Sequence, residues 1–431
     1  MMRKGIILGM VSLCLFSSWV SEGLAQKAVK EVRIAVAGPM KAIPGENHWR
    51  GATMAQDEIN KAGGITIKGA KAPIKLVKID TNELASVSDA VVAVERVAED
   101  VDFYVGTQRS ESTFAMQDVI MKYKKILMGC GAVHPELLLR IAKDYNKYKY
   151  YFMCTISSAF QGPVLVAHLE DVAKIVRDEI GIAKPKVAIL VDKLQWADPI
   201  VKLIETKAPE LGLDVVGVWR PSAMASDVSA ELAAIKGAGA QILFKATSGT
   251  MGIALGKQWG ELQIPAALIG GDAIGLVKSY WEATGGYGKY NTSMTGIGPA
   301  KLTEKTMPFW NGFLKRFNDF PGYESVTYDA IYILKGAIER AGTISSDEVV
   351  AEIEKTDYQG AYGRMAFYPK DQQFPHGLMF GPGYNTWVVN QWRGPEELKV
   401  VWPVGWKGVK YEGAEKYKLP PWVVDYWKKN K

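Results

Sequence analysis

The sequence is poor in the residues that bind metals or form covalent intermediates. Its 431 residues include three cysteines and four histidines, and no pair of them has the His-x-x-x-His or Cys-x-x-Cys spacing of a zinc site. A Gly-x-Ser-x-Gly nucleophile motif and a Gly-x-x-x-x-Gly-Lys-Ser/Thr phosphate loop are also missing. We therefore expect no metal, no cofactor and no catalysis, with an unusual hydrolase built on paired carboxylates as the alternative.

Strong charge of one sign and low-complexity segments are absent as well. The chain carries 52 Lys and Arg against 46 Asp and Glu, a net charge of +6 that is spread along its length. Because nucleic-acid binders carry clustered basic stripes, we exclude nucleic acid as a partner. The hydrophobic share of 48% is that of an ordinary folded protein, and the length favours two lobes or domains.

The sequence has only one long hydrophobic run, and it lies at the N-terminus. Arg3 and Lys4 precede an apolar run over residues 5–20, and the small residues Gly23 and Ala25 stand three and one before a cut after Ala25. A run of roughly 16 residues is shorter than the roughly 20 that span a bilayer, so it predicts a signal peptide cleaved near Ala25. Leu13 is too bulky for the cleavage site of a lipoprotein at Cys14, which disfavours a lipid anchor. We therefore expect a periplasmic protein.

Two cysteines remain after such a cleavage, Cys130 and Cys154. An exported compartment permits a disulfide between them, and two buried free thiols are equally compatible with the sequence. Their spacing leaves both possibilities open.

Short β-rich runs alternate with longer helical patterns from residue 31 onward, which predicts parallel strands covered by helices. The same alternation of strands and helices begins again after about residue 155, which predicts two α/β lobes. Ligands of such sheets bind beyond the carboxyl ends of the strands. The loops that follow predicted strands are residues 38–46, 107–113, 129–134, 192–196, 247–250 and 271–272.

An ordered set of short motifs in and around these loops resembles one known family, the periplasmic substrate-binding proteins of branched-chain amino-acid ABC transporters (the Leu/Ile/Val-binding family). The resemblance covers residues from about 31 to about 400. It is carried by residues 34–39 (Ile-Ala-Val-Ala-Gly-Pro), 57–65, 105–106 with 110–113, 126–128 with 134–137, 187–196, 226–228 and 327–330.

The resemblance implies the type I periplasmic binding protein fold, in which two Rossmann-like lobes with parallel-sheet cores are joined by a three-crossover hinge. The crossings are expected near residues 153–158, 292–298 and 358–363. The implied division is a signal peptide (1–25), a first lobe (26–154 with 296–360), a second lobe (155–295 with 361–404) and an aromatic C-terminal tail (405–431) packed on a lobe.

The resemblance also implies a first-lobe site for a ligand carboxylate, formed by Ser110 and by the backbone of Gly131, Ala132 and Val133. Fixed hydroxyl and N–H donors suit such an anion. Ser110 also fits a helix N-cap. Arg109 departs from the family pattern: it either clamps a further acidic group, favouring a dicarboxylate or an aromatic acid, or pairs with Glu111.

For the second lobe, the resemblance implies that Asp272 binds the ammonium group of an amino-acid ligand, because a carboxylate in a closing cleft is costly unless paired. Helix capping is its alternative role. Trp196 is expected to cover an apolar ligand tail, with ordinary packing as the alternative. Weaker candidates are Thr247 and Tyr323, and Pro44 is expected in the first-lobe wall.

Together these features predict an extracytoplasmic solute-binding protein of an ABC importer. It would capture a small amino acid, branched-chain or related, or a similar carboxylate, and deliver it to the permease subunits as a monomer. A ligand-sensing receptor module of the same fold is the alternative within binding proteins.

Overall fold

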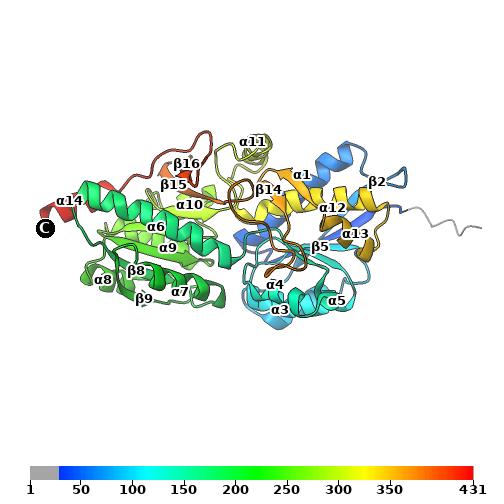
Figure 1. The fold of residues 1–431 in the computed structure, drawn as a ribbon, viewed down its shortest axis with the longest axis horizontal. Coiled ribbons are helices and arrows are strands. Elements are labelled where there is room, and N and C mark those ends of the chain that lie inside the picture. The colour runs from blue at the N-terminus through cyan, green and yellow to red at the C-terminus, as the bar shows by residue number, and fades with distance from the viewer. Residues whose placement is uncertain (1–28, 431) are drawn as a thin grey trace, which may run out of the picture.

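The computed structural model describes residues 29–430, so the expected signal peptide and its cleavage site near Ala25 lie outside the described residues. Two α/β lobes lie side by side along the long axis of the molecule (Figure 1). Among the described residues, no helix has the length and apolar character needed to cross a membrane.

The first lobe is built on a five-stranded parallel sheet of order β4-β1-β5-β6-β7. The strands are mostly apolar because helices cover both faces of the sheet. The strands are β1 (Val32–Gly38), β4 (Ile74–Asp80), β5 (Phe103–Gly106), β6 (Ile126–Gly129) and β7 (Tyr151–Met153). The helices of this lobe are α1 (Ile43–Lys61), α2 (Val87–Glu95), α3 (Ser110–Lys122), α4 (Glu136–Lys143), α5 (Tyr145–Tyr148), α11 (Thr306–Phe317), α12 (Thr327–Ala341) and α13 (Ser346–Ile353).

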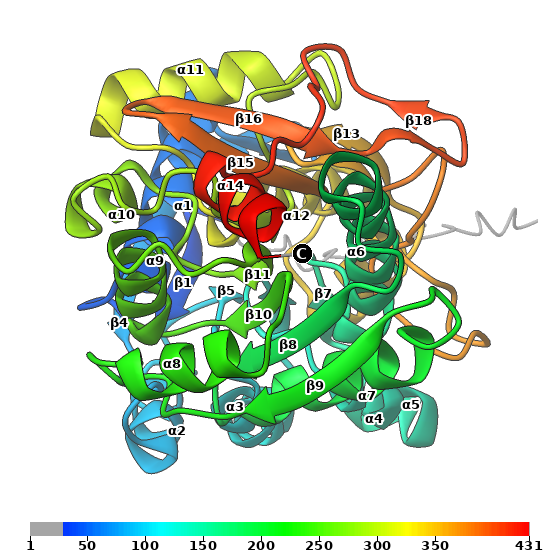
Figure 2. The same ribbon diagram turned by 90° about the vertical axis from the view of Figure 1, so that its left-hand side faces the viewer.

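The second lobe contains a seven-stranded sheet of order β16-β15-β12-β11-β10-β8-β9 (Figure 2). Its strands from β8 to β12 are parallel, and β15 and β16 add an antiparallel edge. The strands are β8 (Lys186–Val191), β9 (Asp214–Trp219), β10 (Ile242–Thr247), β11 (Ala267–Asp272), β12 (Thr292–Thr295), β15 (Val388–Gly394) and β16 (Glu397–Trp402). The helices are α6 (Ser158–Ile180), α7 (Asp198–Lys207), α8 (Ser229–Gly237), α9 (Met251–Glu261) and α10 (Lys278–Ala283).

Short elements complete the fold. They are the hairpins β2 (Ile65–Ile67) with β3 (Ala70–Ala72), β13 (Asp357–Gly360) with β14 (Gly363–Ala366) and β17 (Val404–Trp406) with β18 (Val409–Lys410), the 3-10 turns η1 (Gln195–Ala197) and η2 (Tyr323–Val326), and the terminal helix α14 (Pro421–Lys429).

The chain passes between the lobes three times. The first passage joins β7 to α6 and the second follows β12. The third lies later than residues 358–363, because the chain stays on the first lobe as far as Leu378. The His376 ring stacks on Phe152 with centroids 4.1 Å apart, and Gly377 bridges to Met153.

Residues around Tyr362, His376 and Gly377 therefore pack with the first lobe, and their assignment to the second lobe is wrong. Tyr368 and Phe374, by contrast, pack against Phe160 at the start of α6. The stretch is largely irregular between β14 and β15, so it has no hydrophobic period that could indicate which sheet it packs against.

The C-terminal tail packs on the second lobe. The indole of Trp422 lies 5.1 Å from that of Trp259, and its Nε1 donates to the carbonyl of Ile264 at 3.1 Å. Trp427 donates to the carbonyl of Pro265 at 2.5 Å. These contacts hold α14 near the amino end of β11, on the lobe end shown in Figure 2.

The two cysteines are free and buried on neighbouring strand ends. Cys130 follows β6 and Cys154 follows β7, and the Cys130 thiol donates to the carbonyl of Met128 at 3.3 Å. Burial and the nearby Cys130 raise the pKa of the Cys154 thiol well above its usual range. The Cys154 side chain is therefore held as a neutral thiol.

Candidate ligand-binding site

A cavity lies where the carboxyl ends of the two sheets face each other. It contains about 660 Å³ of space not occupied by atoms, part of it open to solvent. Residues from five of the six loops singled out in the sequence line it; the loop over residues 38–46 does not. The predicted site residues among the lining are Arg109, Ser110, Gly131, Val133, Trp196, Thr247, Asp272 and Tyr323.

Two predicted residues lie outside this lining. Pro44 is buried in the first turn of α1. Ala132 is 1% exposed, and its N–H donates to the carbonyl of Thr107 at 3.3 Å. Ala132 therefore fixes the loop between its two lining neighbours, Gly131 and Val133.

The first-lobe wall is built around the start of α3. Gly106 ends β5 at φ +113°, and a side chain there would collide with the Ala37 carbonyl, so glycine allows the turn toward the cavity. Ser110 is the first residue of α3, and Arg109 is its N-cap, so Ser110 does not fill the capping position itself. The first N–H groups of a helix have no acceptor within it, and here they stand next to the Ser110 side chain.

A buried carboxyl group supports this loop from behind. Glu83 accepts hydrogen bonds from the N–H groups of Gln108 and Arg109, at 2.9 and 2.7 Å, and from the hydroxyl of Thr81 at 2.9 Å. Complete burial nevertheless raises its pKa from 4.5 to about 7. Glu83 is thus a positioning residue for the loop that carries Ser110.

Arg109 pairs with Glu111, its Nε lying 3.3 Å from the carboxylate, so the second of its two predicted roles is observed. The other Glu111 oxygen accepts the N–H of Gln195 from the second lobe at 3.2 Å. Glu111 thereby links the two lobes across the mouth of the cavity.

Polar groups on the floor of the cavity come from both lobes. The Tyr323 hydroxyl accepts from Gln108 Nε2 at 2.8 Å and donates to the Gly131 carbonyl at 3.2 Å. Gln108 Oε1 and Thr247 Oγ1 are buried and have no hydrogen-bond partner among the described residues. Unpaired buried polar atoms are costly, so these two are candidates for contacts with a ligand.

Trp196 stands in the second-lobe wall with a fixed orientation. Its Nε1 donates to Asp192 at 3.2 Å, and the other oxygen of Asp192 accepts the N–H and the hydroxyl of Ser248, both at 2.7 Å. Burial raises the pKa of Asp192 to about 6. These bonds hold the indole against the cavity.

Asp272 reaches the cavity with its charge already paired. Its Oδ2 lies 2.5 Å from Lys245 Nζ, and neither side chain is exposed to solvent. Its Oδ1 accepts the N–H of Ile274 at 3.2 Å. A side chain on Gly252 would approach the Asp272 carboxylate to 2.7 Å, so the group is also packed against α9.

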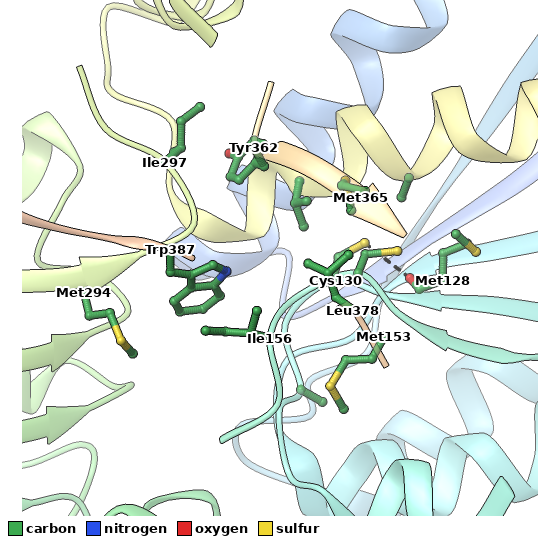
Figure 3. Packing of buried hydrophobic residues seen from close by; sticks show 14 of the residues in the cluster. Met128, Cys130, Met153, Ile156, Met294, Ile297, Tyr362, Met365, Leu378 and Trp387 are labelled. Carbon is green, nitrogen blue, oxygen red and sulfur yellow. Dashed lines mark hydrogen bonds between the residues drawn. The ribbon is translucent and has the colours of Figure 1, made fainter. Parts of the chain in front are cut away.

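Some of the lining was not recognised in the sequence. Gln161 and Leu165 come from the start of α6, Met294 from β12, and Trp387 from the third passage between the lobes. Figure 3 shows Trp387 and Ile156 between Met294 on one side and Cys130 on the other. Only the position of Met294 within a predicted crossing could have pointed to the site.

Fold and cavity together define a two-lobed binding protein whose ligand site lies between its α/β lobes. The chain belongs to the periplasmic binding protein family, a family of solute-binding proteins, whose model matches residues 32–382.

Similar proteins are of comparable length. The leucine-, isoleucine-, valine-, threonine- and alanine-binding protein of Pseudomonas aeruginosa is 25% identical over 366 residues, covering 83% of this chain and 91% of the relative. The branched-chain amino-acid transporter substrate-binding protein of Streptococcus pneumoniae, solved with isoleucine, superposes with a TM-score of 0.70 at 20% identity, covering 87% and 100% of the two chains. A solute-binding protein of R. palustris, solved with benzoate, has a TM-score of 0.70 at 14% identity, covering 90% and 98%.

Proposed function

We propose that this chain captures a small organic carboxylate between its two lobes and delivers it to the membrane permease of an ABC importer. The cavity between the carboxyl ends of the two sheets is the observation that carries the proposal. The names of the relatives support it, since they describe binding of amino acids or of benzoate by proteins of the same fold. Export to the periplasm with cleavage near Ala25, and action as a monomer, belong to the same proposal.

The first lobe would hold the ligand carboxylate. Ser110 offers a hydroxyl, and the first N–H groups of α3 offer donors at the positive end of the helix dipole, which together suit a desolvated anion. Gly131 and Val133 bring the neighbouring loop to the same wall. Trp196 and Trp387 present flat apolar faces that would cover the rest of the ligand.

Closure is the proposed mechanism. A ligand that contacts both lobes stabilises the closed arrangement over an open one and shifts the population toward it. The contact between Glu111 and the N–H of Gln195 joins the lobes and exists only when they are together. The closed surface would then be the form that the permease recognises.

A thermal unfolding screen tests this proposal. The purified protein is heated with amino acids, dicarboxylates, aromatic acids and amides, each at several concentrations. A ligand present at 100 times its Kd stabilises the folded state by about 2.7 kcal/mol and raises Tm in a concentration-dependent way. Absence of stabilisation across the panel contradicts the proposal, and chemical conversion of the stabilising solute would favour the hydrolase alternative.

A further inference from the structure

We infer that the ligand is a carboxylic acid without an amine beside its carboxyl group, and that the buried ion pair of Lys245 and Asp272 makes this selection. The inference rests on the proposed function, because it specifies the ligand of the same cavity.

The two partners come from neighbouring parallel strands. Lys245 lies in β10 and Asp272 ends β11, with Thr247 as the register partner of Asp272. Their 2.5 Å contact is fully buried, and the second carboxylate oxygen is occupied by the Ile274 N–H at 3.2 Å. The fold therefore supplies the cation that this carboxylate needs.

An arriving ammonium group would find no unpaired carboxylate among the described residues that line the cavity. Asp272 and Glu111 are the acidic residues among the described cavity lining, and both are paired, Asp272 with Lys245 and Glu111 with Arg109. To bind there, the ammonium would have to share the Asp272 carboxylate with Lys245, which has no exposure to solvent. Two buried cations on one carboxylate leave a net positive charge out of water, which is costly, so a zwitterionic ligand is disfavoured.

The rest of the ligand meets mainly apolar side chains. Val133 lies on the first lobe, Leu165, Leu194, Trp196 and Met294 come from second-lobe elements, and Trp387 lies at the third passage. Such a wall suits an aliphatic or aromatic body. The favoured ligand is thus a monocarboxylate with a mainly apolar body, whose one charge is bound at the start of α3.

Ligand pairs that differ only in the amine test the inference on the purified protein by titration calorimetry. We would compare 4-methylpentanoate with leucine and 3-phenylpropanoate with phenylalanine. Because a desolvated charge without a partner forfeits at least one charged hydrogen bond, the amine-free member should bind at least about tenfold more tightly.

The outcomes distinguish a failure of this inference from a failure of the proposed function. Equal or tighter binding of leucine or phenylalanine overturns the inference and leaves the proposed function standing. Binding of neither member of either pair also overturns it, and the proposed function then depends on the wider thermal screen. Failure of every solute in that screen contradicts both.

The variant Lys245→Met tests the role of the ion pair itself. It leaves Asp272 without its cation, so a ligand ammonium can take that place. The ratio of amino-acid to amine-free affinity should rise by about tenfold or more over the unaltered protein. The double variant Lys245→Met with Asp272→Asn removes both charges and should return the ratio toward its original value.

An unchanged ratio in Lys245→Met would assign the pair a purely structural role and contradict the inference. Circular dichroism and Tm establish that each variant is folded before its affinities are compared. Should the single variant not fold, the ligand pairs measured on the unaltered protein still decide.

Discussion

At the residue scale, buried carboxyl groups set the chemistry of this protein. Burial raises the pKa of Glu83 to about 7, of Asp192 to about 6, of Glu324 to about 8 and of Asp329 to about 6. Each group accepts backbone or side-chain hydrogen bonds that lower its pKa only in part. Glu83 and Asp192 position a loop and a side chain at the cavity, and all four groups make stability depend on pH.

Glu83 provides the sharpest test of this dependence. Its pKa is about 7 when folded and 4.5 ordinarily, so between these values the unfolded chain has released a proton that the folded protein still holds. Stability is therefore lost as pH rises from 4.5 to 7. Glu83→Gln keeps acceptors for Gln108 and Arg109 but does not titrate. Relative to this variant, the unaltered protein should lose about 3 kcal/mol over that range.

Urea unfolding of both proteins between pH 4.5 and 8 measures this difference. If the free energy of unfolding changes with pH in the same way in both proteins, Glu83 is ionised throughout, and its three hydrogen bonds lower its pKa by more than burial raises it. The same experiment without ligand separates folding from binding.

At the element scale, the strand ends account for what the sequence could predict. Parallel strands bring their carboxyl ends to one edge, so Ser110, Trp196 and Thr247 could be placed in one site from their position after predicted strands. The pairing of Lys245 with Asp272 could not be predicted from the sequence. It depends on which strands are neighbours and on which face Lys245 points, and a lysine inside a strand carries no such signal.

The irregular third passage was equally beyond prediction. Trp387 follows a stretch without regular secondary structure and lines the cavity from a left-handed backbone position, φ +55°. Only tertiary packing, with His376 against Phe152, determines where that stretch lies.

The contact between α3 and η1 gives a prediction at this scale. Gln195→Pro removes the N–H that Glu111 accepts, while proline suits the first residue of a helical turn and Leu194 is already extended at φ −132° and ψ 148°. Loss of this hydrogen bond should weaken ligand binding by about three- to tenfold, as expected for about 1 kcal/mol. The change acts by favouring the open arrangement.

Gln195→Ala is the matched control, because it shortens the same side chain and keeps the N–H. Its affinity should equal that of the unaltered protein in the same calorimetric titration. Equal weakening in both variants would assign the effect to the glutamine side chain and exclude the backbone contact as the cause.

At the scale of the whole molecule, binding and anchoring of the tail occupy opposite ends of the second sheet. The cavity lies at the carboxyl ends of β10 and β11, whereas the tail contacts Ile264 and Pro265, just before β11 begins. The lobe between them is a close-packed α/β core with Trp259 fully buried. Stability contributed by the tail should therefore be separable from ligand affinity.

Trp422→Ala tests that separation. The variant loses the indole packing against Trp259 and the hydrogen bond to the Ile264 carbonyl, so the free energy of unfolding should fall by about 2 kcal/mol. Tyr287→Ala is the control: this exposed aromatic residue of the same lobe should change stability by no more than about 0.5 kcal/mol. Urea unfolding measures both, and calorimetry should give unchanged ligand affinity for both. A parallel loss of affinity in Trp422→Ala would mean that the tail, through the sheet, sets the geometry of the strand ends that bind the ligand.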